Sequence, residues 1–382
     1  MNFCLIRPLR NLLASVLVSM LVSLSFAQTI EDVQKSAEAG DARAQYQLAI
    51  RYMKGKDVPF DLAIGMAWME NAANQNVVPA QYAIGLAYDE GRGVRKSYTD
   101  AFKWMKLAAD AGVVQAQLKV GIYYFEGTGT SRNTGRAFTY FEMAADKGNE
   151  VGQYKLGSLY YLGKGVDQDL VKAASWFAKA AEQGDVNAQY DLAVMYEQGV
   201  GVPRSYETAL LWYYKAVAGH HVSAAYNVGV LHTMNFPGHP SLKNTERALT
   251  HFRIAANHGH VAAMNNLGVI LTESANDEAT RKEGLTWLGK AAVSGHPSAQ
   301  YNIGKIYLAG ELARQDKVEA YFWINQASLS GNEKAGRMLN QLADEMTVDE
   351  LLEAQRKAKA RRDAAKAEKV AAAEKADGTG EN

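Results

Sequence analysis

Bulky aromatic residues return along the chain at a fixed interval of 36 residues, which lengthens once to 39. One such position holds Tyr46, Tyr82, Leu118, Tyr154, Tyr190, Tyr226, Asn265 and Tyr301. A second position, with the same intervals, holds Trp68, Trp104, Tyr140, Trp176, Trp212, His251, Trp287 and Trp323, and it contains all 6 tryptophans. Self-similarity at a period of this length is typical of a repeat architecture in which each copy stacks on its neighbours. We therefore expect the rings to be buried between copies.

Each copy is predicted to form two helices. In the first half, apolar and small side chains follow helical spacing, as in Tyr46, Ala49, Ile50 and Met53. Three residues after the tyrosine position a small residue recurs, namely Gly85, Gly121, Gly157, Ala193, Gly229, Gly268 and Gly304. Glycine inside a helix costs about 1 kcal/mol relative to alanine, so its recurrence predicts a close helix contact. A second helix, from Asp169 to about Gln183, presents an apolar face made of Ala173, Trp176, Phe177, Ala180 and Ala181.

The segment Gly163-Lys164-Gly165 superficially matches a phosphate-binding loop. Such a loop follows a strand, and its lysine precedes Ser or Thr, whereas here a helical pattern precedes it and Val166 follows. Similar segments stand at 90–94, 126–130 and 198–202. A recurring glycine at this place predicts a left-handed residue that ends the first helix of each copy.

The pattern AxYxLG, then GxGV, then KAxxWFxKAAxxG resembles the Sel1-like repeat, a longer relative of the tetratricopeptide repeat. The resemblance covers about residues 41–331, with copies starting near 41, 77, 113, 149, 185, 221, 260 and 296, and a closing helix at 332–346. It implies an all-α fold, an α/α solenoid of about eight 36-residue helix-turn-helix repeats within residues 28–346. It also implies a protein-interaction scaffold of a kind that bacteria often export to the periplasm.

The two ends of the chain differ from the array. Residues 1–27 have the features of a secretory signal peptide, with Arg7 and Arg10 before an apolar run and Ser25-Phe26-Ala27 at its end. Cleavage there predicts a periplasmic or secreted protein without a membrane anchor, and an uncleaved anchor is the alternative. Residues 347–382 predict a charged, Ala/Lys-rich solvated helix and a disordered tail, or a basic contact with acidic lipid or an acidic partner.

Composition and motifs argue against several function classes. Lys plus Arg and Asp plus Glu both number 41, so no basic excess points to nucleic acid. The only cysteine, Cys4, lies in the signal segment. Neither GxSxG nor HExxH occurs, and no carboxylate pair stands out from the repeat. We therefore predict no catalytic residue, no cofactor and no metal, and hence no enzyme.

All 8 histidines lie between residues 220 and 296. His221, His260 and His296 occupy equivalent positions in successive copies, where Asp41, Asn149, Asp185 and Asn332 are predicted helix N-caps. Adjacent helices lie about 8–10 Å apart, so equivalent histidines cannot share one zinc ion. We interpret them as structural or surface residues. A pH-responsive patch, or a metal site that mixes His220 or His221 with His258 or His260, is the alternative.

A polar position follows the tyrosine position in six consecutive copies, at Lys119, Lys155, Asp191, Asn227, Asn266 and Asn302. Four residues later stand the apolar residues Tyr123, Leu159, Met195, Leu231, Ile270 and Ile306. In related helical repeats the first helices line the concave surface, and alternating amide and apolar side chains suit a groove for a segment of another protein. The alternative is that the apolar series belongs to the core between copies.

These observations predict an exported scaffold that binds a protein partner in its concave groove, in envelope assembly, signalling or host interaction. Two alternatives come from other classes. One is a regulatory inhibitor of a membrane sensor kinase, and the other is a hydrolase that acts on cell-wall material.

Overall fold

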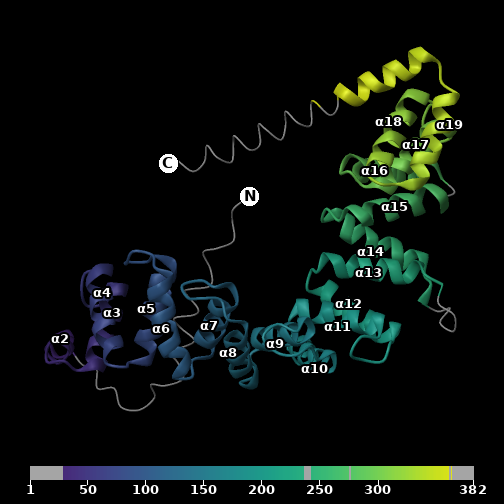
Figure 1. Ribbon diagram of the computed structural model, residues 1–382. Helices are drawn as coiled ribbons and strands as arrows, with labels where there is room; N and C mark the ends of the chain where they lie inside the picture. Colours follow the sequence, from purple (N-terminus) through teal and green to yellow (C-terminus); the bar gives the residue numbers. More distant parts are fainter. Residues whose placement is uncertain (1–28, 236–241, 275–276, 361–362, 364–382) are drawn as a thin grey trace. The chain divides into compact units, whose positions relative to one another are not determined.

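The computed structural model describes residues 29–235, 242–274, 277–360 and 363 (Figure 1). The predicted signal peptide, the insertion at 236–241 and the end of the tail lie outside these residues. Within them the protein forms helices and no strand, as the periodicity predicted. The sequence divides into two units, Met1–Arg204 and Ser205–Asn382, which we name the N-terminal unit and the C-terminal unit.

Each unit is a succession of helices that pack on their neighbours in the sequence. The N-terminal unit contains α2 (Ile30–Glu38), α3 (Ala42–Lys54), α4 (Leu62–Asn74), α5 (Val78–Glu90), α6 (Tyr98–Asp110), α7 (Val114–Glu126), α8 (Thr134–Asp146), α9 (Glu150–Leu162), α10 (Leu170–Glu182) and α11 (Val186–Gln198). The C-terminal unit contains α12 (Tyr206–Ala218), α13 (Val222–Thr233), α14 (Thr245–Asn257), α15 (Val261–Ser274), α16 (Glu278–Val293), α17 (Pro297–Ala309), α18 (Lys317–Leu329) and α19 (Glu333–Asp344).

The helix boundaries follow from local chemistry. Helix α9 ends at Gly163, whose φ of 64° lies in the left-handed region that glycine adopts without a steric penalty. Helix α10 begins after Asp169, whose carboxylate accepts a hydrogen bond from the Lys172 amide at 2.9 Å. The Gly-Lys-Gly segment is therefore a turn between two helices, and the predicted span of the second helix is confirmed.

The recurring glycine of the first helix is a point of close contact, as predicted. A Cβ atom on Gly121 would lie 2.6 Å from the Phe141 ring, and one on Gly229 would lie 2.5 Å from the Phe252 ring. Both distances are far below van der Waals contact, so only glycine allows the two helices of these repeats to pack at this depth.

The tryptophans are less buried than the sequence suggested. Trp104 is 6% exposed, and the other five are only partly buried. The residue after each tryptophan position is the buried one, as Phe177 and Tyr213 show at 2% and 0% exposure. Lysines cover some of the indoles instead, and Lys179 Nζ lies 3.6 Å from the centre of the Trp176 ring. The tryptophan position and the residue after it both lie on the apolar side of the second helix. The neighbouring helix packs on the residue after the tryptophan.

A buried glutamine connects successive repeats, a feature that the sequence analysis missed. Its side-chain amide donates to a carbonyl eight residues earlier, at the end of the preceding helix, at distances of 3.1–3.4 Å. The residues are Gln45, Gln81, Gln117, Gln153, Gln189 and Gln300. The recurring AQY triplet is the signal that could have revealed it. A polar residue at a fixed buried position adds a directional bond to the apolar packing.

The segment after α19 is helical at 348–360 and is not simply solvated. Thr347 and Glu350 form the predicted capping box, in which the Thr347 amide donates to the Glu350 carboxylate at 2.8 Å. Ala354 is fully buried, and Lys357 forms an ion pair with the nearly buried Glu319 of α18. Alanines allow this close approach without the apolar stripe that a larger interface needs. In the part of the protein that the structure describes, no helix is long and apolar enough to span a bilayer.

Candidate functional site

The six predicted polar residues lie on first helices and are all partly exposed. In the N-terminal unit they are Lys119 on α7, Lys155 on α9 and Asp191 on α11. In the C-terminal unit they are Asn227 on α13, Asn266 on α15 and Asn302 on α17. Within each unit they occupy the same helical position in consecutive repeats, and we name them the polar row.

In the N-terminal unit, Lys119 is bonded to the preceding repeat. Its Nζ lies 2.7 Å from Asp89 Oδ2 on α5. The hydroxyl of Tyr123 donates to the other oxygen of the same carboxylate at 2.5 Å. Burial and the Asp89 carboxylate hold the pKa of Tyr123 well above its usual range. These bonds tie α7 to α5 and leave Lys119 less available to a partner.

Asp191 is engaged in a similar way. Its carboxylate accepts a hydrogen bond from the Tyr154 hydroxyl of α9 at 3.1 Å. Burial, followed by the charge of Asp191, raises the pKa of Tyr154 to about 12. Burial also raises the pKa of the Asp191 carboxyl. The polar row of this unit therefore contributes to contacts between repeats.

Two asparagines of the C-terminal unit, Asn227 and Asn266, each use one side-chain group in a hydrogen bond to a nearby side chain. The Asn227 side chain donates to the Tyr213 hydroxyl at 3.0 Å, and the Asn266 carbonyl accepts from the Asn265 amide at 3.1 Å. An asparagine side chain has two donors and an acceptor with two lone pairs, so each keeps capacity for a partner. Asn302 lies at a pocket described below.

The predicted apolar half of the site is wrong. Tyr123, Leu159 and Met195 are 2% exposed, and Leu231 is 1% exposed. Four residues beyond the polar row, the side chain has turned toward the neighbouring helices, so these residues belong to the core, as the alternative interpretation stated. Ile270 and Ile306 remain partly exposed.

Two partly exposed valines stand three positions after the polar row in the C-terminal unit. Val230 and Val269 also pack against the cores of their repeats, and the exposed Lys305 takes the third equivalent position. Residues three apart on a helix are surface neighbours. The face therefore combines asparagine amides on α13, α15 and α17 with partly exposed valines on α13 and α15 and a lysine on α17.

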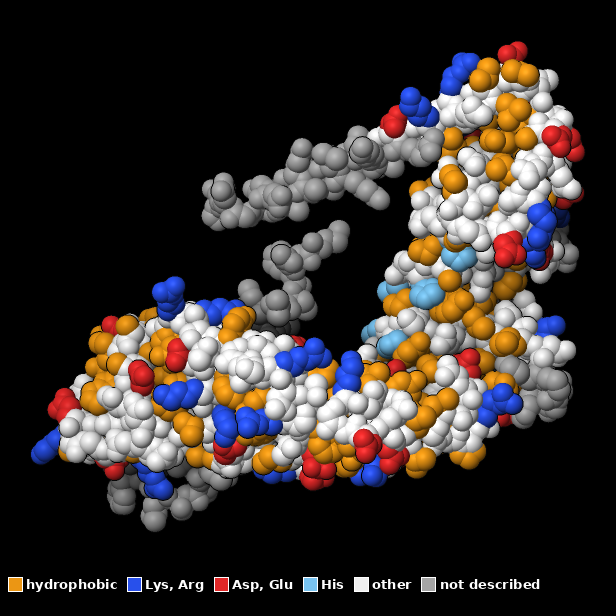
Figure 2. Space-filling model, in the orientation of Figure 1, with side chains coloured by type: hydrophobic (Ala, Val, Ile, Leu, Met, Phe, Trp, Pro, Cys, Tyr) orange, Lys and Arg blue, Asp and Glu red, His pale blue; other side chains and the backbone are white. Residues whose placement is uncertain are grey.

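The three equivalent histidines cap helices. Nδ1 of His221, His260 and His296 accepts hydrogen bonds from the amides of Ala224, Ala263 and Ala299, at 3.1, 3.2 and 3.3 Å. An accepting Nδ1 requires the neutral ring with its proton on Nε2, and burial lowers the pKa of all three rings. Figure 2 shows histidine side chains at the surface of the C-terminal unit. Among the residues that the structure describes, no cluster of three or more potential metal ligands occurs.

Together these features define a class, an all-α solenoid of stacked helix pairs. The sequence model of the Sel1 repeat matches residues 42–77, 78–113, 114–149, 151–185, 186–221, 222–260 and 297–332, well over half of the sequence. The chain therefore belongs to the Sel1 repeat family. Residues 261–296, predicted as another copy, lie between two of these matches, although the structure forms the helix pair α15–α16 there.

A solved structure agrees with this assignment, and a second has a similar sequence. A Sel1 repeat protein from Oxalobacter formigenes is 29% identical, with a TM-score of 0.62, over 82% of the present sequence and 90% of its own. A protective antigen of uropathogenic Escherichia coli with the same type of fold is 26% identical over 87% and 94%, with a TM-score of 0.39. No curated protein matches the sequence. Sel1 repeat proteins are generally non-catalytic scaffolds for protein interactions.

Proposed function

We propose that this protein is an exported scaffold that binds a protein partner along the first helices of its C-terminal unit. The observation that carries the proposal is the partly exposed series Asn227, Asn266 and Asn302, with Val230 and Val269 beside it. Amides that both donate and accept suit the backbone of a bound segment, and the valines offer it apolar contact.

The two units support this choice through their difference. Lys119 and Asp191 are held by Asp89 and Tyr154 of neighbouring repeats. These bonds commit Lys119 and Asp191 to contacts between repeats, whereas each asparagine offers a partner both donors and an acceptor. The C-terminal unit is therefore the better binding face.

The setting that we propose is the periplasm, or the exterior of the cell, in envelope assembly, signalling or host interaction. The support is the charged and apolar pattern of residues 1–27. N-terminal sequencing of the protein from cell fractions tests this directly. A mature protein that begins at Gln28 is the expected result, and a retained Met1 in the cytoplasm would contradict it.

A photo-crosslinking amino acid at position 230 or 269 tests the binding face in living cells. The control position is Val293, which is 78% exposed and lies on the second helix α16. We expect one common partner at 230 and 269, absent at 293, and lost when Asn227, Asn266 and Asn302 are all replaced by alanine. If that variant folds and every crosslinked species is unchanged, the face is wrongly assigned.

A further inference from the structure

The turns of the N-terminal unit close tightly on the preceding repeat. A Cβ atom on Gly165 would lie 2.3 Å from the carbonyl oxygen of Thr134, at the first position of α8. Gly129 and Gly201 approach Tyr98 and Leu170 in the same way, at 2.1 and 2.2 Å. Only a hydrogen atom fits at these three positions, so their glycines close the space between successive repeats.

No turn between the first and second helices of the C-terminal unit has this pair of glycines, and the turn after α17 keeps only the first of them. The turn after α17 begins with Gly310, but Leu312 stands where the second glycine would be. The position that faces it, equivalent to Thr134, is occupied by Arg281. Helix α16 also begins early and spans 16 residues, whereas most second helices span 13. Two long side chains therefore replace a backbone contact. Arg281 lies in residues 261–296, which the family model leaves unmatched, and Leu312 lies in the matched copy that follows.

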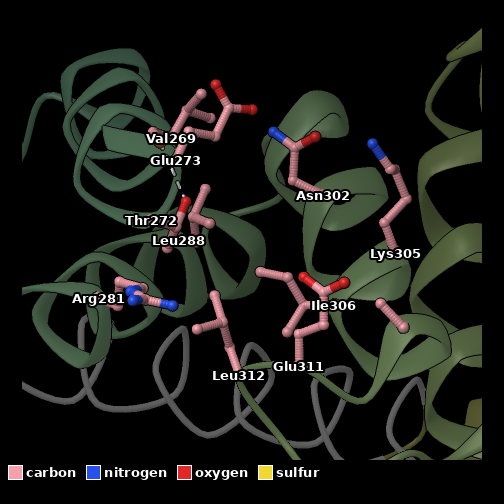
Figure 3. A pocket seen from close by; sticks show the side chains of 11 residues that line it. Val269, Thr272, Glu273, Arg281, Leu288, Asn302, Lys305, Ile306, Glu311 and Leu312 are labelled. Atoms are coloured by element: carbon pink, nitrogen blue, oxygen red, sulfur yellow. Dashed lines mark hydrogen bonds between the residues drawn. The ribbon is translucent and has the colours of Figure 1, made fainter. Parts of the chain in front are cut away.

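A pocket of about 550 Å³ opens at this place, between α15, α16, α17 and the turn after α17 (Figure 3). Leu288, Ile306 and Leu312 provide its apolar walls. Asn302 of the polar row lines the same pocket, together with the exposed Lys305. The pocket is therefore continuous with the proposed binding face.

Arg281 is the group in this pocket that needs a ligand. Its Nε is buried and has no hydrogen-bond acceptor, and Figure 3 shows its side chain reaching toward Leu312. The Thr272 hydroxyl already donates to carbonyls of its own helix, at 2.9 and 3.0 Å. A buried donor on a charged group is destabilising when it lacks an acceptor.

The acidic side chains near the pocket do not accept a hydrogen bond from Arg281 Nε. Glu273 and Glu311 line the pocket, yet among the described residues neither forms an ion pair with Arg281. The Asp277 carboxylate accepts from the Thr280 amide at 2.8 Å as the cap of α16, and this bond, more than the charge of Arg281, lowers the pKa of Asp277.

We infer that this pocket binds a carboxylate group presented by a peptide beside an apolar side chain. A planar guanidinium bonds a carboxylate through two parallel hydrogen bonds, and the leucine and isoleucine walls accept the neighbouring apolar group. The inference rests on the proposed function, because a partner on the asparagine face would place such a group next to Asn302. Both an acidic side group and the free carboxyl end of a polypeptide have this chemistry.

Four short peptides distinguish these sources on the purified full-length protein. The first is Leu-Glu-Leu-Ala, acetylated and amidated at its ends, and the second is its glutamine counterpart. The third is acetyl-Leu-Ala-Leu with a free carboxylate, and the fourth is the amide of the third. Binding is followed by the Nε–H signals of ¹⁵N-labelled arginines, and the signal of Arg281 is assigned from the Arg281→Gln variant.

We expect one acid peptide to shift the Arg281 signal and to bind about tenfold or more tightly than its neutral counterpart, as for a charge-assisted bond. The acid that binds identifies the source. Arg281→Gln should abolish the difference, whereas Arg314→Gln, an exposed control in the turn after α17 that does not line the pocket, should keep it. Equal binding of acid and neutral peptides, or no binding at millimolar concentration, would overturn the inference.

Two further results keep the test decisive. If Arg281→Gln does not fold, the Nε–H shifts of the unmodified protein still decide between acid and neutral peptides. The peptides are tested on purified protein, and the crosslinks at 230 and 269 are tested in cells. Peptide binding without crosslinks would remove the proposed partner face alone, and crosslinks without peptide binding would remove the pocket alone.

Discussion

The two units solve the same structural problem, the start of a first helix, with different chemistry. In the N-terminal unit, Asp41, Asn149 and Asp185 cap α3, α9 and α11. In the C-terminal unit, His221, His260 and His296 accept the equivalent hydrogen bonds. The geometry is shared, but only the imidazole loses its acceptor within a mildly acidic range. The comparison shows that one repeated backbone position can hold a stable cap or a titratable one.

Acidification provides the strongest test of this difference. Burial lowers the folded-state pKa of the three histidines below the usual value of about 6.5, so the unfolded state takes up protons first. Their contribution is fully present above about pH 6.5 and is lost as the pH falls through the unfolded pKa toward the folded one. At about 1 kcal/mol for each cap, the C-terminal unit should lose roughly 3 kcal/mol. Hydrogen exchange measured helix by helix at pH 7.5 and pH 5 checks this.

The N-terminal unit is the internal control for that experiment. Its aspartate and asparagine caps keep their acceptors through this range, so α3, α9 and α11 should change little in exchange rate. A triple variant with asparagine at 221, 260 and 296 should remove the part of the acid sensitivity that comes from the caps, and the part that remains belongs to His232, whose pKa burial also lowers. Equal loss of protection in both units, or no effect of the triple variant, would contradict the assignment of the histidines as titratable caps.

The buried glutamines give the next largest expected effect. Five of the six lie in the N-terminal unit, whereas the C-terminal unit has Ala225 and Met264 at two of the equivalent positions. Gln153→Met should destabilise the N-terminal unit by about 1–2 kcal/mol, because it removes bonds to the Ala145 carbonyl and the Gln183 amide. Chemical denaturation measures this. A matched Gln47→Met variant on the surface of α3 should have little effect, and equal effects of the two would show that the buried bond is unimportant.

Much of the fold could be predicted from the sequence, because a repeat reports the same geometry many times. The glycine at Gly163 and the small residue at Gly121 each have one simple steric reason, and both predictions are confirmed. The periodicity did not predict which of two adjacent residues is buried when both lie on the apolar side of a helix, as Trp176 and Phe177 do. It also did not predict the burial of Leu159. Residues three and four positions apart on a helix both lie on nearly the same side, so the spacing alone does not tell which of them is exposed.

The pocket and the glutamine bonds could not be predicted for another reason. A glutamine is usually exposed, so the burial of Gln117 at 0% exposure is visible only once the neighbouring helix is in place. Leu312 in place of a glycine is visible in the sequence, but its consequence depends on Arg281, 31 residues earlier. Single departures from a repeat thus become informative only when the packing partner is known.

A smaller effect separates two of the histidine caps from each other. The His260 ring stacks on Tyr226, with centroids 4.4 Å apart and planes at 22°. His260→Asn keeps a cap but removes this stacking, and should cost about 1 kcal/mol at pH 7.5. His296→Asn keeps a cap as well, and is the matched control with an expected change near zero. Thermal unfolding of both variants measures the difference, and equal midpoints would show that the stacking does not contribute.

The smallest effect concerns a buried acceptor that lacks a donor. The Oε1 atoms of Gln45 and Gln153 accept from Gln75 and Gln183, each 30 residues later, at 2.8 and 2.7 Å, whereas Oε1 of Gln300 has no partner, as is also true of Gln117 and Gln189 in the N-terminal unit. Position 330, 30 residues after Gln300, holds Ser330.

The backbone at this position already allows the missing donor. Ser330 has φ −88° and ψ 11°, close to the −81° and −7° of Gln183. Ser330→Gln should therefore stabilise the C-terminal unit by about 0.5–1 kcal/mol, the net value of one hydrogen bond. Ser330→Asn is the matched control, since the shorter asparagine amide does not reach as far. A gain for glutamine alone in chemical denaturation would show that the N-terminal pattern transfers to the C-terminal unit, and equal effects would show that the buried oxygen is satisfied in another way.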